Sequence, residues 1–205
     1  YILVKDQSDG DFCKKENLML DDFQQKVKYW QSKLLKEREQ RIRPALDDKS
    51  LTSWNALMCQ GYTDAYLAFG NKYYLHSAIK NARFILDKQC QSDNSLWHSY
   101  KDGQSSINGF LEDYAFTISA FIRLYEATFD EQWLNKAKDL TNYCQTHFYD
   151  RQSGMFFFTS DLDARLVARK MEINDNVIPA SSSVMANNLF ALSLIHISEP
   201  TRQLQ

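Results

Sequence analysis

Two adjacent carboxylates, Glu112 and Asp113, lie within the apolar segment GFLEDYAF at 109–116. They would occupy the first turn of an amphipathic helix, and we expect at least one of them to face inward because their neighbours are apolar. Glycoside cleavage and sugar epimerisation need one carboxylic acid to donate a proton and a second base to accept one. The pair is therefore a candidate for acid–base chemistry on a carbohydrate.

Two further acidic segments also precede predicted helices. One contains Asp47 and Asp48, and the other contains Asp175 ahead of a proline and three serines. If the three helix starts lie at one end of the fold, their acids converge on one cleft. We assign catalysis to Asp48, Glu112 and Asp113, and substrate binding to Asp47, Trp54, Asn55, Tyr114 and Asp175, with aromatic rings stacking on a pyranose and Asn55 bonding its hydroxyls.

These acids also have a structural interpretation. Acids in a first helical turn interact favourably with the helix dipole, by about 0.3–1 kcal/mol each, and Asp is a preferred N-cap. The two interpretations predict different outcomes for alanine at Asp48 or Asp113. We expect alanine at either position to abolish sugar binding or turnover in the full-length protein without unfolding it, whereas loss of thermal stability alone would indicate capping.

The hydrophobic pattern predicts mainly helices. Apolar residues at three- and four-residue steps predict helices over 21–40, 51–69, 72–89, 109–128 and 131–147, and a further helix starting near Ser183. The aromatic segment 96–103 ends in Asp-Gly and predicts a β-hairpin. A second extended hairpin is predicted from Met155 to Glu172, and residues 1–20 are predicted to be irregular.

An internal repeat relates the two central helix pairs. Residues Tyr66, Ala68, Tyr74, Leu75, Ala78 and Phe84 match Tyr125, Ala127, Trp133, Leu134, Ala137 and Tyr143 at a constant offset. Such repeats are typical of stacked units that cannot bury their apolar faces alone. The fold class is therefore predicted to be all-α with small β-hairpins, a partial (α/α)6 toroid with about three helical hairpins of six.

The repeat and the chain ends suggest three regions. Residues 1–20 are predicted to be an irregular segment of a longer protein, because the chain begins at Tyr1 without an initiator Met. Residues 21–191 are predicted to form the partial toroid domain. Residues 192–205 look like the translation of a sequencing-library adapter, and Pro200 would interrupt a helix there.

Composition argues against several partners and cofactors. The formal net charge of −2 gives no reason to expect nucleic acid, and no apolar run is long enough for a membrane span. The four cysteines are far apart, without metal spacing, and are expected to be reduced thiols of a cytoplasmic protein. No histidine pair has ligand spacing, so we predict no metal and no cofactor. His98 and His147 have no identifiable acid partner and are treated as ordinary polar residues.

Several segments together resemble a known family. RPALDDKSLTSWNALM at 43–58, GFLEDYAF, LYEATFDEQWL at 124–134 and DNVIPASSSVMANNL at 175–189 resemble the helical region of thioredoxin-domain-containing proteins related to spermatogenesis-associated protein. The resemblance covers about residues 15–191. The family usually has Gly where this chain has Ala56 and Asn where it has Ser182, which weakens a ligand-binding role for the serine-rich loop.

The resemblance implies a six-hairpin, glycosidase-like toroid, similar to acylglucosamine epimerases and unsaturated-glucuronyl hydrolases. If it is an enzyme, it would be a sugar-active hydrolase or epimerase with a carbohydrate ligand. The resemblance also implies a thioredoxin-like domain upstream in the full-length protein. The alternative is a non-catalytic toroid that acts as a scaffold or client-binding region for that redox domain.

Overall fold

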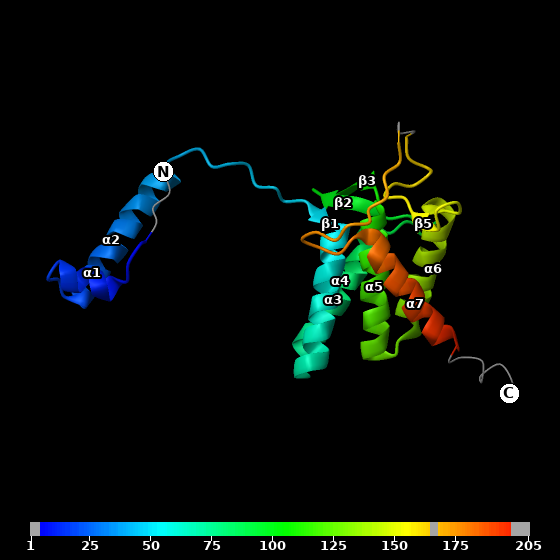
Figure 1. Ribbon diagram of the computed structural model, residues 1–205, viewed down its shortest axis with the longest axis horizontal. Coiled ribbons are helices and arrows are strands. Elements are labelled where there is room, and N and C mark those ends of the chain that lie inside the picture. The colour runs from blue at the N-terminus through cyan, green and yellow to red at the C-terminus, as the bar shows by residue number, and fades with distance from the viewer. Residues whose placement is uncertain (1–4, 165–167, 198–205) are drawn as a thin grey trace. The chain divides into compact units, whose positions relative to one another are not determined.

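A computed structural model describes residues 5–164 and 168–197, and it divides the chain into two compact units (Figure 1). The first unit ends at Asp47 and the second begins at Asp48. The predicted toroid domain starts at residue 21, whereas the compact unit that contains the repeated helices starts at Asp48. The two units are described separately.

The first unit contains two helices, α1 (Asp9–Lys15) and α2 (Leu20–Glu39). The rings of Phe12 and Phe23 pack between them, with centroids 5.1 Å apart. Helix α2 follows the predicted range, but none of its residues is buried. The prediction that residues 1–20 are irregular is wrong over α1. This helix is only seven residues long, which is too short to show a clear apolar period in the sequence.

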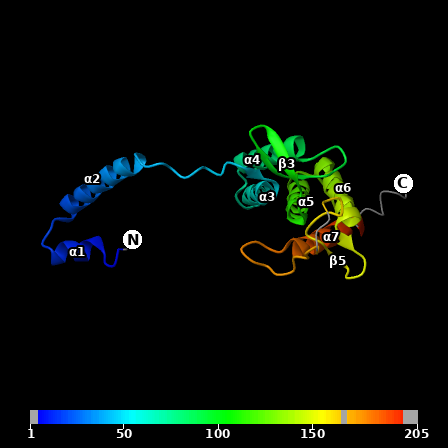
Figure 2. The same cartoon turned by 90° about the horizontal axis from the view of Figure 1, so that it is seen from above.

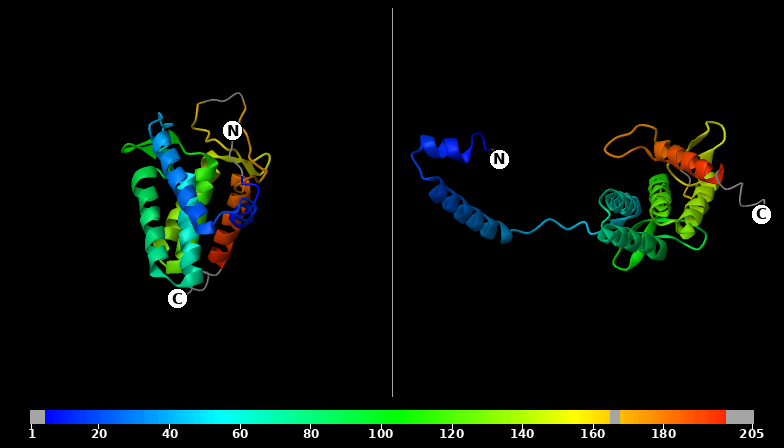
Figure 3. Two further views of the ribbon diagram at one scale, coloured as in Figure 1. Left: turned by 90° about the vertical axis from the view of Figure 1, so that its left-hand side faces the viewer. Right: turned by 90° about the horizontal axis from the view of Figure 1, so that it is seen from below.

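The second unit is built from two rows of helices. Helices α3 (Thr52–Phe69), α5 (Leu111–Thr128) and α7 (Ser181–Ile197) form one row, in which α5 packs between the other two. Helix α4 (Lys72–Phe84), which continues as a π-helical turn over Ile85–Gln89, packs on α3, and α6 (Glu131–His147) packs on α5. Views from above and below show the two rows (Figures 2 and 3). The predicted helical toroid architecture is confirmed.

The turns that join each helix pair repeat the same chemistry. Gly70 (φ 68°) and Phe129 (φ 55°) end α3 and α5 in the left-handed conformation. Asn71 and Asp130 then cap α4 and α6 by accepting a backbone N–H two residues on. Equivalent positions of the internal repeat therefore have equivalent structure.

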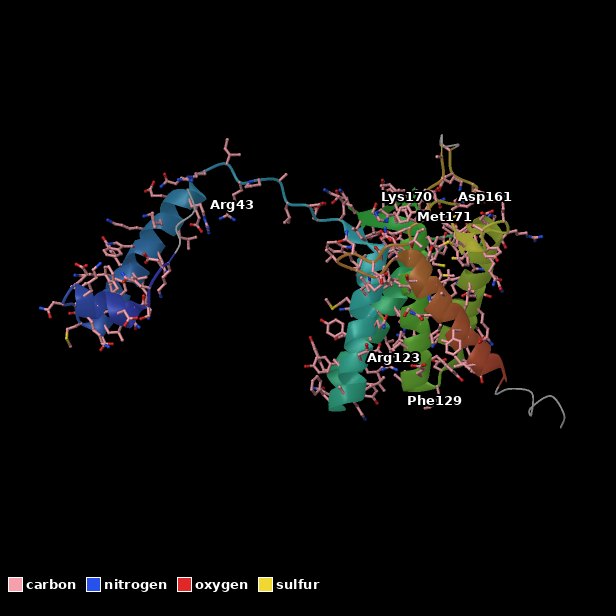
Figure 4. The ribbon with its side chains drawn as sticks, viewed as in Figure 1. Arg43, Arg123, Phe129, Asp161, Lys170 and Met171 are labelled. Carbon is pink, nitrogen blue, oxygen red and sulfur yellow. The ribbon has the colours of Figure 1, made fainter. Side chains whose placement is uncertain are left out.

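Small residues lie between the two rows, and polar pairs join neighbouring helices within the row of α3, α5 and α7. Ala78 of α4 and Ala137 of α6, at equivalent positions of the repeat, are fully buried. Helix α4 packs on α3 and helix α6 packs on α5. Ser119 of α5 donates to Gln60 of α3 at 3.1 Å, and Arg123 donates to Asp64 at 2.6 Å (Figure 4). Both hydrogen bonds join residues 59 positions apart, as expected for adjacent copies of one repeat.

The first predicted β-hairpin is confirmed. Strand β2 (Trp97–Lys101) pairs antiparallel with β3 (Gln104–Asn108), and β1 (Ser50–Leu51) pairs with the other edge of β2. The loop residues Asp102 (φ 50°) and Gly103 (φ 82°) both have positive φ, as a type I′ turn requires.

The second predicted hairpin is much shorter than expected. Strands β4 (Tyr149–Asp150) and β5 (Met155–Phe156) pair, but the described residues from 157 to 180 form neither helix nor strand. Side chains of this segment bind its own backbone instead; for example, Asp163 accepts the N–H of Ser160 at 3.0 Å. Such local hydrogen bonds compete with strand pairing.

Helix α7 begins two residues before the predicted start and continues to Ile197. The first six residues of the predicted non-native tail, 192–197, are therefore helical, and residues 198–205 lie outside the described part. No helix among the described residues combines the length and apolar character needed to cross a bilayer.

Candidate functional site

The N-terminal ends of α3, α5 and α7 lie at one end of the second unit, beside the β1–β2–β3 sheet and the segment after β5 (Figure 1). Figure 4 shows Lys170 and Met171 of that segment at this end, whereas Phe129 lies at the opposite end. The three acidic segments named from the sequence precede or begin these helices. Their carboxylates, however, have different partners.

Asp113 is the centre of the site. It is fully buried. Its Oδ1 accepts the backbone N–H of Ser53 in α3, and its Oδ2 accepts the backbone N–H of Phe110 and Nδ1 of His98, each at 2.9 Å. Burial raises the pKa of Asp113, while the His98 contact and the two backbone N–H donors oppose that rise. One side chain thus joins α3, α5 and β2.

His98 therefore has an acid partner, contrary to our expectation. The hydrogen bond from Nδ1 to Asp113 raises the pKa of His98, and burial opposes the rise. Its ring packs on Phe110 with centroids 4.8 Å apart, and Phe110 stacks on Phe158 at 5.0 Å. His147 also has an acid partner, because its Nδ1 lies 2.8 Å from Oδ1 of Asp161.

Glu112 is half-buried next to this centre. Burial raises the pKa of its carboxyl group, and the charges of Asp113 and Glu172 raise it further, while His98 lowers it. The buried Ser53 hydroxyl is close enough to lower this pKa as well, although it makes no hydrogen bond of regular geometry within the described structure. Glu112 is therefore a carboxyl group that retains its proton to higher pH than usual.

Two acids hold the start of α7. The Glu172 carboxylate accepts from the backbone N of Ser181 at 3.3 Å and from its hydroxyl at 3.0 Å. Asp175 accepts the N–H of Ala180 at 2.7 Å. Asp175 is exposed. Its contact with the N–H of Ala180 fits the structural interpretation, in which the acid caps a helix start, rather than the substrate-binding one.

Asp48 has its ion-pair partner outside the Asp113 cluster. Asp48 is exposed and forms an ion pair of 2.6 Å with Lys101 at the end of β2. That hydrogen bond lowers the pKa of Asp48, so it is poorly suited to donate a proton. Asp47 is exposed and is the last residue of the first unit.

The three other predicted binding residues differ in whether their side chains are free to contact a ligand. The Trp54 side chain is 66% exposed, so its ring is accessible for stacking. Asn55 uses its amide to donate to the carbonyl of Leu51 at 2.8 Å. Tyr114 is fully buried, stacks on Tyr143 and accepts the N–H of Leu96. The prediction that Tyr114 contacts a sugar is therefore contradicted, because its ring and hydroxyl belong to the core.

The same cluster contains groups of the kinds that bind metal ions. Ligand atoms of His98, Glu112 and Asp113 lie within 4.8 Å of one another, and the described residues form no other group of this kind. The oxygens of Asp113 already accept three N–H donors, however. The geometry therefore fits a hydrogen-bonded cluster, in which Asp113 orients His98 and Glu112 keeps the freer carboxyl group.

Sequence reasoning missed three residues of this site: Ser53, His98 and Glu172. His98 is 15 positions from Asp113, and Ser53 is 60 positions away. No local spacing links residues this far apart. For Glu172 a signal existed, because it lies in the same acidic segment as Asp175 and ahead of the same helix.

Comparisons by sequence find relatives among curated proteins. No family model matches the chain. It is 32% identical over 173 residues to an uncharacterised protein of Caenorhabditis elegans, covering 81% of this chain and 24% of the relative. It is 32% identical over 170 residues to human spermatogenesis-associated protein 20, covering 78% of this chain and 22% of the relative. The chain thus spans about a quarter or less of the length of these curated relatives.

Solved structures show the fold. The cellobiose 2-epimerase of Bacillus thermoamylovorans superposes with a TM-score of 0.59 at 16% identity, covering 70% of this chain and 39% of that one. An unsaturated glucuronyl hydrolase specific for heparin superposes with a TM-score of 0.58 at 14% identity, covering 75% and 43%. The chain therefore has homologues named spermatogenesis-associated protein 20 and the α/α-toroid fold of glycosidases and sugar epimerases.

Proposed function

We propose that the chain is part of the six-hairpin glycosidase-like domain of a thioredoxin-domain-containing protein, and that the end formed by the α3, α5 and α7 N-termini binds a carbohydrate. Glu112 is the acid–base group of this site. The observation that carries the proposal is the half-buried Glu112 carboxyl, whose pKa is raised by burial and by two neighbouring carboxylates. Such a group holds its proton to higher pH than an ordinary carboxyl group, as a general acid requires.

The neighbouring residues support that role. In a hydrolase, Glu112 would protonate the glycosidic oxygen; in an epimerase, it would return or remove a proton at the sugar carbon. Asp113 is a positioning residue, because its oxygens are occupied by Ser53, Phe110 and His98. Glu172 supplies the second carboxylate near Glu112, and the exposed ring of Trp54 offers a surface for a pyranose.

A non-catalytic toroid is the second candidate, and one observation favours it. Asp113, Glu172 and Asp175 each accept backbone N–H groups at a helix start, so these acids already have a structural role. In that case the domain would serve as a scaffold or client-binding region for a thioredoxin-like domain elsewhere in the protein. The length of the curated relatives leaves room for such a domain.

We also infer a cytoplasmic location. All four cysteines are free thiols, and Cys13, Cys59 and Cys144 are buried. Burial raises the pKa of Cys59 to about 12, which keeps it protonated and unreactive. Free, inert thiols suit a reducing compartment.

The test compares Glu112→Gln with a matched acid in the full-length protein. A panel of neutral hexoses and disaccharides is screened for binding and for hydrolysis or epimerisation. We expect Glu112→Gln to reduce turnover about 10²- to 10⁴-fold with little change in unfolding. Asp87→Asn, an exposed acid of the π-helical turn, should leave turnover unchanged. Full turnover in Glu112→Gln would contradict the catalytic role, and a protein that binds no sugar would favour the scaffold.

A further inference from the structure

One line of residues on α5 stays accessible although the rest of the helix is packed. Among the residues from Leu111 to Leu124, only Glu112, Ser119 and Arg123 are not buried. Their spacing of seven and four positions places them on one face of the helix. All three are polar. A polar, accessible line therefore runs along α5 from the candidate site at Glu112.

The far part of this line borders a hollow of about 180 Å³ on the row formed by α3, α5 and α7. All three helices contribute to its lining, and most of the side chains that they supply are polar: Gln60, Ser119, Arg123, Glu126, Asn187 and Asn188. Figure 4 shows Arg123 between the end of the row near Met171 and the end near Phe129. The hollow lies away from the helix N-termini, because Ser119 is about 10 Å further along α5 than Glu112.

The amide side chains of the hollow have hydrogen-bonding groups to offer. Asn187 is exposed, and its side chain makes no hydrogen bond to another residue in the part of the chain that the structure describes. Gln60 accepts from Ser119 through its Oε1, which does not use its amide donors. Asn188 donates to the carbonyl of Ala115 at 2.7 Å, which does not use its carbonyl oxygen. Because an amide both donates and accepts, the hollow presents both kinds of group to a ligand.

The charged groups beside the hollow are paired. Arg123 donates to Asp64 at 2.6 Å and to Glu126 at 2.7 Å, so its guanidinium is already neutralised by two carboxylates. Ile122 and Ala191 add apolar surface to the lining. Paired charges, amides and a small apolar area suit a neutral molecule with many hydroxyls. A sugar unit is such a molecule, because its ring has hydroxyls at the edge and C–H groups on its faces.

We infer that the hollow is a second sugar-binding position, and that the ligand is an oligosaccharide that extends from Glu112 along α5 to Asn187. The inference rests on the proposed carbohydrate function. A single pyranose at Glu112 is too short to span the distance of about 10 Å to Ser119, so a monosaccharide leaves the hollow empty. The unit in the hollow takes no part in the chemistry. It contributes binding energy from a part of the substrate remote from the reacting atoms.

The test varies the length of the sugar. Dissociation constants of the full-length protein are measured at pH 7 for β-1,4-linked gluco- and manno-oligosaccharides of one to four units. We expect affinity to rise about tenfold between two and four units, the effect of one or two additional hydrogen bonds in the hollow. Equal affinity at all lengths would overturn the second position and leave the carbohydrate function in place.

One variant tests the assigned residue. Asn187→Ala should reduce the gain between two and four units about 3- to 10-fold, because it removes a donor and an acceptor of the hollow. Asn135→Ala is the matched control, because Asn135 is an exposed asparagine of the outer helix α6, and it should leave the gain unchanged. A full gain in Asn187→Ala would contradict the second position. Binding of no sugar of any length would overturn both this inference and the proposed function.

Discussion

The buried carboxylate of Asp113 in α5 accepts a hydrogen bond of 2.9 Å from the backbone N of Ser53 at the start of α3. The same carboxylate holds His98 of β2 and the N–H of Phe110. Asp113 therefore joins two neighbouring helical hairpins at the end where the candidate site lies. Its adjacent residue, Glu112, makes none of these connections, so the structural and chemical roles of the acid pair are divided between the two residues.

Removing the Asp113 side chain should destabilise the fold. Asp113→Ala leaves three N–H donors without their acceptor, that of Ser53 buried and those of Phe110 and His98 partly buried, and we expect a loss of about 3–5 kcal/mol in the free energy of unfolding. Asp113→Asn retains one acceptor oxygen and should cost about 1–3 kcal/mol. Urea unfolding of the full-length protein measures both.

Asp130→Asn is the matched control, because Asn caps a helix as well as Asp does, and it should change stability by less than about 0.5 kcal/mol. An Asp113→Ala variant of unchanged stability would contradict the structural role. The three N–H donors held by Asp113 thus argue against our sequence-based expectation that alanine at this position leaves the fold intact.

The His98–Asp113 pair should make stability depend on pH. The pKa of His98 is raised above its usual value of 6.5 by Asp113, so folding favours the protonated ring. The stabilisation is fully present below about pH 6.5 and is lost as pH rises through the higher pKa of the folded state. The difference in unfolding free energy between the wild type and His98→Asn should therefore shrink as pH rises. A constant difference between pH 5.5 and 9 would argue against this pair.

Gly109 should not tolerate a side chain. A Cβ there would lie 2.6 Å from the carbonyl oxygen of Leu96 and 3.1 Å from the Tyr114 ring. Since a backbone carbonyl cannot easily move aside, Gly109→Ala should cost about 1–3 kcal/mol. Gly61 provides the opposite case in α3, because a Cβ at that position would have no neighbouring atom within 4 Å. Gly61→Ala should stabilise the helix by about 0.5–1 kcal/mol, and thermal unfolding distinguishes the two.

Trp54 should contribute to sugar binding without contributing to stability. Its side chain is 66% exposed at the start of α3, whereas Phe69 is 75% exposed at the other end of the same helix. Trp54→Ala should weaken binding about 3- to 10-fold, the range expected for one aromatic stacking contact. Phe69→Ala should have no effect in the same titration. Equal effects of the two variants would argue against binding at the Trp54 end.

Local patterns in the sequence were enough to predict the helices of the second unit, the Asp102-Gly103 hairpin and the repeat. Apolar spacing reports which face of a helix is buried, and a two-residue turn with positive φ accepts few residue types. The chemistry of turns such as Gly70-Asn71 and Phe129-Asp130 is equally local. Glu112 and Asp113 could be singled out because acids inside an apolar helix start are visible in the sequence.

The role of each acid, in contrast, depends on tertiary contacts. Asp48 pairs with Lys101 at the surface, and Asp113 is buried against Ser53 and His98. The Tyr114 ring, which sequence reasoning assigned to a ligand, packs in the core. Each outcome depends on which side chains meet across distant positions of the chain, 15 apart for His98 and Asp113 and 60 apart for Ser53 and Asp113. Burial and charge partners, which set both pKa and accessibility, arise from those contacts and not from residue type or spacing.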